Sequence, residues 1–214
     1  RFFNLKPPGG EFADFNELLA ISTGFQPAEV LDQDGLVIIH TAAVAGRPRG
    51  ALLSHRNFIG ANVHLNLLMH LSPADVHLNL LPLFHVGGLF MATMAFHAGA
   101  LNINMSKFDA VQAVELIADR KATVMFDFAP IMNSILEQQA AAGKAIDSLQ
   151  HVIGIEAPQT IEKYQKLTGG TFYVMYGQTE TSAIATLGRY NDRPGSAGQT
   201  IPLADVRLVD DNGR

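Results

Sequence analysis

The chain of 214 residues contains no cysteine. This absence excludes a disulfide framework, a thiolate nucleophile and a cysteine-ligated metal site, and it is compatible with a cytoplasmic location, which we expect. The sequence also lacks a run of ~20 apolar residues, so we expect no transmembrane segment. Prolines and glycines at residues 7–10 interrupt the apolar start, which is not typical of a signal peptide.

Charged residues are scarce, at 16% of the sequence against 48% hydrophobic residues. This balance predicts a substantial buried core, as one large domain or part of a larger one. The net charge of -5 does not favour a nucleic-acid partner. Residues 35–74 lack aspartate and glutamate but include three arginines, a local positive field that suits a small anionic ligand, although such windows also arise by chance.

Several catalytic signatures are missing as well. No Gly-Lys-Ser/Thr closes a glycine-rich loop, so there is no Walker A motif, and no His-Glu-x-x-His metal motif occurs. The order of the residues gives no basis for a Ser–His–Asp triad. Any chemistry must therefore come from other motifs.

Apolar segments typical of helices and of strands alternate along the chain. We expect helices at about residues 11–22, 54–70, 87–97, 109–120, 129–142 and 160–167, with Ser54 as an N-cap. We expect strands at residues 36–40, 76–83, 100–104, 122–126, 151–155 and 172–176. This alternation predicts an α/β fold with a mostly parallel sheet flanked by helices.

The expected elements divide the chain into three parts. Residues 1–34 form an N-terminal segment and linker, residues 35–190 form the α/β core, and residues 191–214 begin a further β subdomain with a strand at 204–209. Arg1 is not an initiator methionine, and residues 212–214 resemble a turn without its second strand. We therefore expect a piece of a longer protein.

Four unusual segments are expected at the carboxyl ends of strands, where parallel sheets bind their ligands. They follow Ile39, Leu81, Ile155 and Met175. Their shared placement is more informative than any of them alone.

The first of these segments, residues 40–50, is a glycine-rich basic loop. Gly46 and Gly50 flank Arg47-Pro48-Arg49, and a helix is expected soon afterwards. Small residues let backbone N–H groups approach an anion and arginine supplies charge, so the pattern is typical of a phosphate cradle. A plain tight turn is an equal alternative.

The fourth segment crowds polar groups of several kinds into five positions: Tyr176, Gly177, Gln178, Thr179 and Glu180. The aromatic ring could flank a purine, the threonine hydroxyl could bond a phosphate oxygen, and the carboxylate could help to hold Mg²⁺, a hard cation that accepts phosphate oxygens as ligands. The alternative is an ordinary helix N-terminus with Thr179 as its cap.

The second segment reads Leu-Pro-Leu-Phe-His-Val-Gly-Gly at residues 81–88. It places His85 beside an aromatic residue and a glycine pair that leaves room for a ligand. The alternative is a partly buried histidine with satisfied hydrogen bonds.

In this order, the segments resemble motifs of the adenylate-forming (AMP-binding) superfamily, in its acyl-CoA synthetase branch. Residues 176–180 match its Tyr-Gly-x-Thr-Glu motif, and residues 81–85 match Leu-Pro-x-Phe/Tyr-His. Residues 154–158, Gly-Ile-Glu-Ala-Pro, fall where the family has a turn that lines the adenine pocket, and residues 194–202 are similar to its Pro-Gly-Ser-x-Gly-x-Pro stretch. The likeness covers residues 34–214 and identifies a fragment of the large N-terminal domain.

The resemblance implies ATP-dependent activation of a carboxylic acid. The acid would attack the α-phosphate of ATP–Mg²⁺, and coenzyme A would then displace AMP to give a thioester. Catalysis would rest on positioning and charge neutralisation rather than on a protein nucleophile. The implied partners are ATP, Mg²⁺, coenzyme A, a small carboxylic acid and the C-terminal domain of the same polypeptide, and the oligomeric state stays open.

The resemblance also assigns roles to matching positions. The catalytic candidates are Thr179, Glu180 and His85. Thr179 would bind the α-phosphate, Glu180 would be a ligand of Mg²⁺, and His85 would line the acyl channel. The candidates for holding adenosine are Gly154, Glu156, Ala157, Pro158, Tyr176, Gly177 and Gln178. The candidates for the outer phosphates are Thr41, Gly46, Arg49 and Gly50.

The chain departs from the family pattern in two places. Residues 42–45, Ala-Ala-Val-Ala, replace the hydroxyl residues of the phosphate loop, and Arg49 stands in the lysine place. A hydrogen bond to a charged group is worth ~1.5–3 kcal/mol, so we expect weaker contacts with the outer phosphates. The Thr-Gly-Asp motif and the C-terminal domain with its catalytic lysine are absent, so we expect the isolated chain to be inactive.

Three hypotheses follow: an acyl-CoA synthetase, an acyl-AMP ligase that delivers to a carrier protein, and a catalytically degraded nucleotide-binding or interaction module. The apolar residues at 84–96 and 125–132, with no lysine or arginine among them, favour an aliphatic acid and a place in fatty acid metabolism. Core packing explains the same residues equally well.

Overall fold

The computed structural model describes residues 3–4, 13–20, 24, 26–41 and 46–213, in two compact units that divide after Leu31. In the first unit, β1 (Phe3–Asn4) pairs in parallel with β2 (Ala13–Asp14), and α1 (Phe15–Leu19) follows. The prediction of a helix at residues 11–22 was wrong at residues 13–14, which form strand β2. There Asp14 accepts the backbone N–H of Asn16 at 2.9 Å, which favours a turn into a short helix. Residues 11, 12, 21 and 22 lie outside the described residues.

The second unit is built around a seven-stranded sheet in the order β11-β10-β9-β8-β7-β5-β6. Five of its strands are parallel: β5 (Val76–Asn79), β6 (Leu101–Asn104), β7 (Val124–Phe128), β8 (His151–Ile155) and β9 (Thr171–Tyr176). Two antiparallel strands, β10 (Thr186–Arg189) and β11 (Gln199–Thr200), extend it beyond β9.

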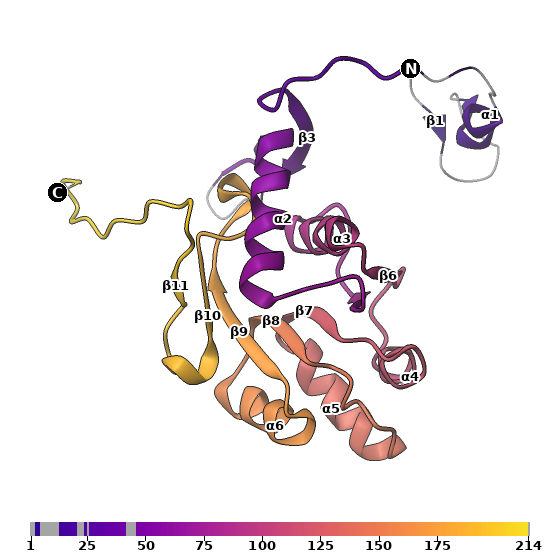
Figure 1. Ribbon diagram of the computed structural model, residues 1–214, viewed down its shortest axis with the longest axis vertical. Helices are drawn as coiled ribbons and strands as arrows, with labels where there is room; N and C mark the ends of the chain where they lie inside the picture. Colours follow the sequence, from indigo (N-terminus) through magenta and orange to yellow (C-terminus); the bar gives the residue numbers. More distant parts are fainter. Residues whose placement is uncertain (1–2, 5–12, 21–23, 25, 42–45, 214) are drawn as a thin grey trace. The chain divides into compact units, whose positions relative to one another are not determined.

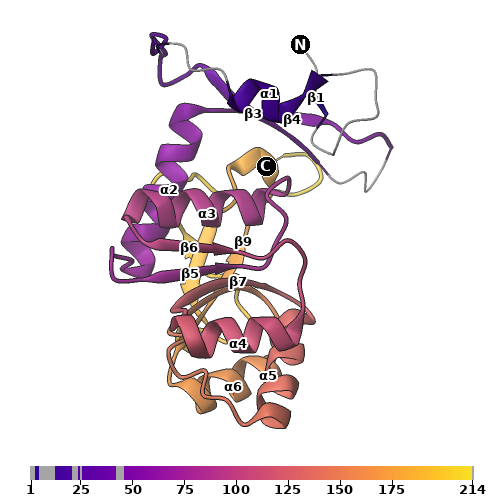
Figure 2. The same ribbon diagram turned by 90° about the vertical axis from the view of Figure 1, so that its right-hand side faces the viewer.

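Helices cover both faces of this sheet (Figures 1 and 2). One face carries α2 (His55–Met69) and α3 (Val86–Ala98), and the other carries α4 (Ala110–Arg120), α5 (Ile131–Ala142) and α6 (Pro158–Thr168). The predicted α/β fold with a mostly parallel sheet is confirmed. None of the described helices is long and apolar enough to cross a membrane.

Successive residues of the central strands face opposite helical layers. Val124 and Tyr173 belong to the core beneath α2 and α3, whereas Met125 and Phe172 belong to the core beneath α4, α5 and α6. Strands that are buried on both faces become continuous apolar runs, which is why the sequence predicts them well.

The predicted N-terminus of α2 is confirmed. Ser54 is the N-cap, its Oγ accepts the backbone N–H of Asn57 at 3.3 Å, and Asn57 Oδ1 accepts the N–H of Ser54 at 2.9 Å. This reciprocal capping box satisfies donors that the first helical turn leaves unpaired.

Several strand predictions differ from the structure. The strand expected at residues 76–83 ends at Asn79, and β11 was not expected. A strand that was not expected, β4 (Gly50–Ser54), precedes α2 and pairs antiparallel with β3 (Gly35–His40) in a separate two-stranded sheet. The loop at residues 40–50 therefore joins two strands of a hairpin and does not lead directly into a helix. Strand β10 was not expected either. Residues 204–209 are not a strand, because no described strand supplies hydrogen bonds to them and Leu208 is fully exposed.

Candidate functional site

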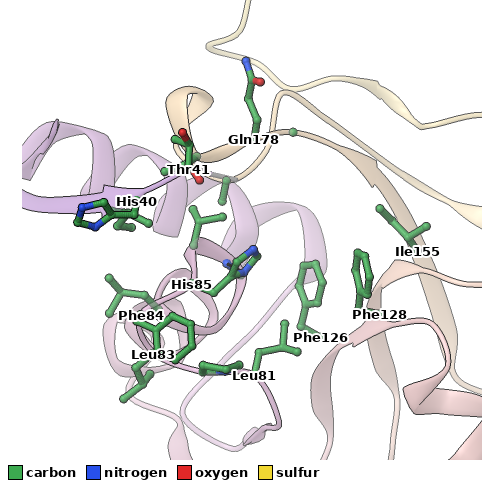
Figure 3. A pocket seen from close by; sticks show the side chains of 18 of the residues that line it. His40, Thr41, Leu81, Leu83, Phe84, His85, Phe126, Phe128, Ile155 and Gln178 are labelled. Carbon is green, nitrogen blue, oxygen red and sulfur yellow. Dashed lines mark hydrogen bonds between the residues drawn. The ribbon is translucent and has the colours of Figure 1, made fainter. Parts of the chain in front are cut away.

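A cavity of about 1040 Å³ opens at the carboxyl ends of the parallel strands (Figure 3). It is lined by residues that follow β5, by the end of β7 and the turn after it, by the end of β8 and by the segment after β9. The β3–β4 hairpin, although it is not part of this sheet, contributes residues 37–41. Segments far apart in the sequence therefore share one cavity.

One end of this cavity is polar. The predicted residues that line it are Thr41, His85, Gly177, Gln178, Thr179 and Glu180. Figure 3 shows Thr41 and Gln178 at its upper rim with the ring of His85 below them. The lining thus includes a hydroxyl, a carboxylate and an imidazole, whereas the amide group of Gln178 points away from His85 and Thr41.

The segment after β9 forms a single 3₁₀ turn, η1 (Thr179–Thr181). Its cap is Gln178, whose backbone N–H donates to Thr181 Oγ1 at 3.1 Å, and the same hydroxyl donates to the Gln178 carbonyl at 3.0 Å. The alternative in which Thr179 caps a helix is therefore wrong. Thr179 instead lines the cavity beside Glu180.

The end of β9 is held by strand β10. The backbone N–H of Tyr176 donates to Thr186 Oγ1 at 3.0 Å, and that hydroxyl donates to the carbonyl of Ala197. Gly177 passes so close to the chain that an added Cβ would collide with the carbonyl oxygen of Ala183. Only glycine fits here, so the conformation of residues 177–180 depends on it.

His85 has one ring nitrogen committed to the fold. It is the N-cap of α3, and its Nδ1 accepts the backbone N–H of Gly87 at 3.1 Å. In a neutral ring the proton must then lie on Nε2, which leaves Nε2–H as the free donor.

The rest of the cavity is apolar. Phe126 and Phe128, two residues apart on β7, lie on the same face, with Ile155 of β8 beside Phe128 (Figure 3). Phe128 and Ile155 remain 55% and 53% exposed, so they present apolar surface to the cavity rather than to the core. The sequence indicated Phe126 and Phe128 only as members of the apolar segment 125–132, and it assigned no role of their own to Ile155 or His40. Period-two spacing at the end of a strand is the signal that could have found the two phenylalanines.

The turn at residues 154–158 lies at the end of β8. An added Cβ on Gly154 would collide with the carbonyl oxygen of Asp127 on the neighbouring strand. Glu156 Oε1 accepts the N–H of Ala157 at 2.7 Å, and Pro158 begins α6. Ile155 lines the cavity, whereas Glu156, Ala157 and Pro158 follow it outside the lining.

The hairpin places Thr41 and Arg49 opposite each other. The N–H of Thr41 donates to the Arg49 carbonyl at 2.8 Å, and the N–H of Arg49 donates to Thr41 Oγ1 at 3.4 Å. Residues 42–45 lie outside the described residues. The predicted residues that do not line the cavity are Gly46, Arg49, Gly50, Gly154, Glu156, Ala157, Pro158 and Tyr176.

The lining described here carries one carboxylate, Glu180, and neither lysine nor arginine. In the described part of the chain, no group of three or more histidine, aspartate or glutamate side chains could hold a metal by itself. A single carboxylate nevertheless fits Mg²⁺, because this ion takes phosphate oxygens and water as its other ligands.

This polar rim, with its Tyr-Gly-x-Thr-Glu segment beside an apolar cavity, agrees with a family model described as AMP-binding enzyme, which matches residues 6–214. The chain belongs to the AMP-binding enzyme family. It is thus related to the adenylate-forming ligases that use coenzyme A or an acyl carrier.

Three relatives illustrate the likeness. An indoleacetate–CoA ligase of Aromatoleum aromaticum is 31% identical over 215 residues, which cover 97% of this chain and 42% of that protein. The fatty acid–[acyl-carrier-protein] ligase ScoC of Streptomyces coeruleorubidus is 27% identical over 208 residues, covering 91% and 40%. A crystal structure of a proposed long-chain-fatty-acid CoA ligase from Rhodopseudomonas palustris is 43% identical with a TM-score of 0.90, covering 98% and 52%. The chain therefore spans about half, or less, of these relatives.

Proposed function

We propose that the protein containing this chain activates an aliphatic monocarboxylic acid with ATP and transfers the acyl group to coenzyme A. The observation that supports this most is that one cavity joins an apolar wall to a rim with a hydroxyl, a carboxylate and an imidazole. The hydrocarbon chain would lie against the wall and the carboxylate at the rim. The carboxylate would attack the α-phosphate, forming an acyl adenylate and releasing pyrophosphate.

Three rim residues would act at the reacting atoms. Thr179 would donate its hydroxyl to an α-phosphate oxygen, and Glu180 would hold Mg²⁺ together with phosphate oxygens. Mg²⁺, when bound, would neutralise charge on the phosphates. His85 would present Nε2–H to an oxygen of the carboxylate or the phosphate. None of them is a nucleophile, so their contribution is positioning and electrostatic stabilisation.

The nucleotide would extend from this rim in two directions. Adenosine would lie against Tyr176, whose ring is 54% exposed and accessible for stacking, and against Gly177, Gln178 and the turn at residues 154–158. The outer phosphates would lie along the hairpin, near Thr41, Gly46, Arg49 and Gly50. Arg49 is exposed and offers a planar fork in place of a point charge.

The cavity lining favours an aliphatic acid with one carboxylate. The described lining has no lysine or arginine that could pair with a second carboxylate. Each buried CH₂ group contributes about 0.8 kcal/mol, so affinity would rise with chain length until the apolar end is filled.

The test is acid-dependent exchange of pyrophosphate into ATP by the full-length protein, with saturated monocarboxylic acids of increasing length and matched dicarboxylic acids. We expect exchange with the monocarboxylic acids and thioester formation when coenzyme A is added. Acyl transfer to a phosphopantetheinylated carrier protein but not to coenzyme A would favour the second candidate, a carrier-protein ligase, which the likeness to ScoC supports. No exchange with any acid, and no binding of AMP, would indicate a degraded module instead.

We further infer that the chain of 214 residues is inactive by itself, because it spans only 40–52% of the relatives above. The isolated chain should show no acid-dependent exchange under conditions in which the full-length protein is active. Robust exchange by the isolated chain would refute this.

A further inference from the structure

Two carboxyl side chains, Asp127 on β7 and the half-buried Glu156 in the turn at residues 154–158, each have one buried oxygen without a hydrogen-bond partner. Asp127 lies on β7 between the cavity residues Phe126 and Phe128, but its side chain points to the opposite face, toward α5. It is fully buried. A buried carboxyl group is unusual unless its oxygens are satisfied or its charge is removed.

One oxygen of Asp127 has a structural partner and the other has none. Oδ1 accepts the N–H of Met132 at 3.0 Å, in the first turn of α5, whose N-cap Pro130 offers no side-chain hydrogen bond. Oδ2 is buried without a hydrogen-bond partner. Capping of α5 therefore accounts for the position of Oδ1 but not for the burial of Oδ2.

Glu156 has the same asymmetry. Its Oε1 accepts the N–H of Ala157 at 2.7 Å, whereas its Oε2 is buried and without a partner. Gly154 is the register partner of Asp127, Ile155 is that of Phe128, and Glu156 is the first residue after β8. Glu156 is close enough for its charge to raise the pKa of Asp127. Because an added Cβ on Gly154 would collide with the Asp127 backbone, glycine is what allows the two strands to approach at this point.

We propose that Asp127 and Glu156 share one proton between Oδ2 and Oε2, and that Asp127 is through this bond a positioning residue for the turn at residues 154–158. The inference rests on the proposed function, in which this turn holds adenosine. Adjacent carboxylates do not both ionise readily, and one proton between them satisfies both orphaned oxygens. A continuous hydrogen-bonded path then runs from Met132 on α5 to Ala157 at the start of α6.

The electrostatics around Asp127 support a proton at neutral pH. Burial, and then the charge of Glu156, raise the pKa of Asp127 to about 7, against the opposing effect of the Met132 and Phe128 N–H groups. The charged residues of the two packing helices lie beyond their first turns: Glu137 on α5, and Glu162, Lys163 and Lys166 on α6. The titratable residue of strand β5, His77, pairs with Val124 and so faces the opposite side of the sheet.

The pH dependence follows from this arrangement. Below the pKa of Asp127, its carboxyl group holds the proton and the turn is tied to β7. As the pH rises through the pKa of Asp127, the proton leaves, two negative charges face each other and the turn is displaced. Affinity for adenosine nucleotides should then fall.

The experiment uses the full-length protein and three variants. Asp127→Asn keeps the acceptor for Met132 and gives a permanent N–H donor toward Glu156. Asp127→Ala removes both bonds, and Asp119→Asn is a control at an exposed carboxylate on α4. AMP binding is measured by calorimetry from pH 6 to 9, and the protonated carboxyl group is followed by its infrared carbonyl band. Because AMP itself titrates, each dissociation constant is compared with that of the control at the same pH.

Between pH 6 and 9, the dissociation constant for AMP should rise about tenfold more in the wild type and in the control than in Asp127→Asn. A tenfold change is what results if AMP binding shifts the pKa of Asp127 by one unit. The infrared band should be present at pH 6, disappear by pH 9 and be missing in Asp127→Asn. Asp127→Ala should bind AMP weakly at every pH.

An unchanged band in Asp127→Asn would refute the shared proton, and equal pH dependence in wild type and Asp127→Asn would refute the positioning role. Failure of the wild type to bind AMP at any pH would instead refute the proposed function, while the infrared band would still test the proton.

Discussion

The Nδ1 atom of His85 accepts the backbone N–H of Gly87 at 3.1 Å, so a single side chain both begins helix α3 and lines the cavity. The hydrogen bond fixes the tautomer, since a ring nitrogen that accepts cannot carry the proton of the neutral ring. His85 can therefore act in the cavity through Nε2 alone, and its structural and chemical roles belong to different atoms.

This separation makes His85→Asn an informative change. The asparagine oxygen can still cap α3, but no group replaces Nε2–H. We expect adenylate formation to slow about 100-fold while unfolding in urea stays within about 0.5 kcal/mol of the wild type. His85→Ala should slow the reaction equally and also destabilise the protein by about 1 kcal/mol. Full activity of His85→Asn would show that Nε2 takes no part in the reaction.

Replacement of Glu180 should act on the metal requirement. Glu180 is exposed at the cavity rim, so Glu180→Gln removes a charge without disturbing the core. We expect a lower kcat and a higher Mg²⁺ concentration for half-maximal exchange, because a neutral amide is a weaker ligand for a hard cation. Glu137→Gln, at an exposed site on α5, is the matched control. An unaltered Mg²⁺ titration in Glu180→Gln would exclude Glu180 as a ligand.

A cation in the apolar wall should change the preferred acid. Phe128→Arg places a guanidinium where the described lining has no positive charge. A charged hydrogen bond contributes ~1.5–3 kcal/mol, so activity on a long dicarboxylic acid should rise about tenfold or more relative to the monocarboxylic acid of equal length. Phe96→Arg, at a site that is 82% exposed on α3 and outside the lining, should leave this ratio unchanged. Equal ratios in both variants would place the hydrocarbon chain elsewhere.

His77 should make the protein sensitive to mild acid. It is fully buried on β5; Nδ1 lies 2.7 Å from Asn102 Oδ1 and Nε2 has no partner. Burial lowers the pKa of His77 to about 4, despite the opposing effect of Asn102, from 6.5 in the unfolded chain. Between pH 6.5 and 4 the unfolded state binds the proton more readily, so the contribution of His77 to stability is present above pH 6.5 and is lost as the pH falls.

The loss should reach about 3 kcal/mol at pH 4, which urea unfolding at a series of pH values would measure. His77→Gln should reduce it, whereas His97→Gln, at an exposed site on α3, should not. A pH dependence that is the same in His77→Gln and the wild type would mean that His77 is not the group responsible.

The sequence predicted the central parallel strands β7, β8 and β9 because they are largely buried between helical layers and therefore form short apolar runs. It also predicted the start of α2, since a capping box is formed by residues three positions apart. Both are local signals. Likewise, a contiguous motif such as residues 176–180 can be recognised from its own letters.

Other features depended on partners far away in the chain. Strand β4 was missed because its pairing with β3 spans the loop at residues 40–50, and β10 was missed because its partners are β9 and β11. The strand expected at residues 204–209 had the right composition but no described partner, and composition alone does not form backbone hydrogen bonds.

By itself, then, the sequence determined the α/β class, the order of the helices and of the parallel strands, and the family, because these follow from hydrophobic period and from contiguous motifs. The tertiary structure alone decided which side chains meet. It placed Phe126 and Phe128 in the cavity and Asp127 behind it, a difference set by the alternation of one strand within a particular sheet. It also paired Asp127 with Gly154, because proximity across strands depends on register, which neighbouring residues in the chain do not specify.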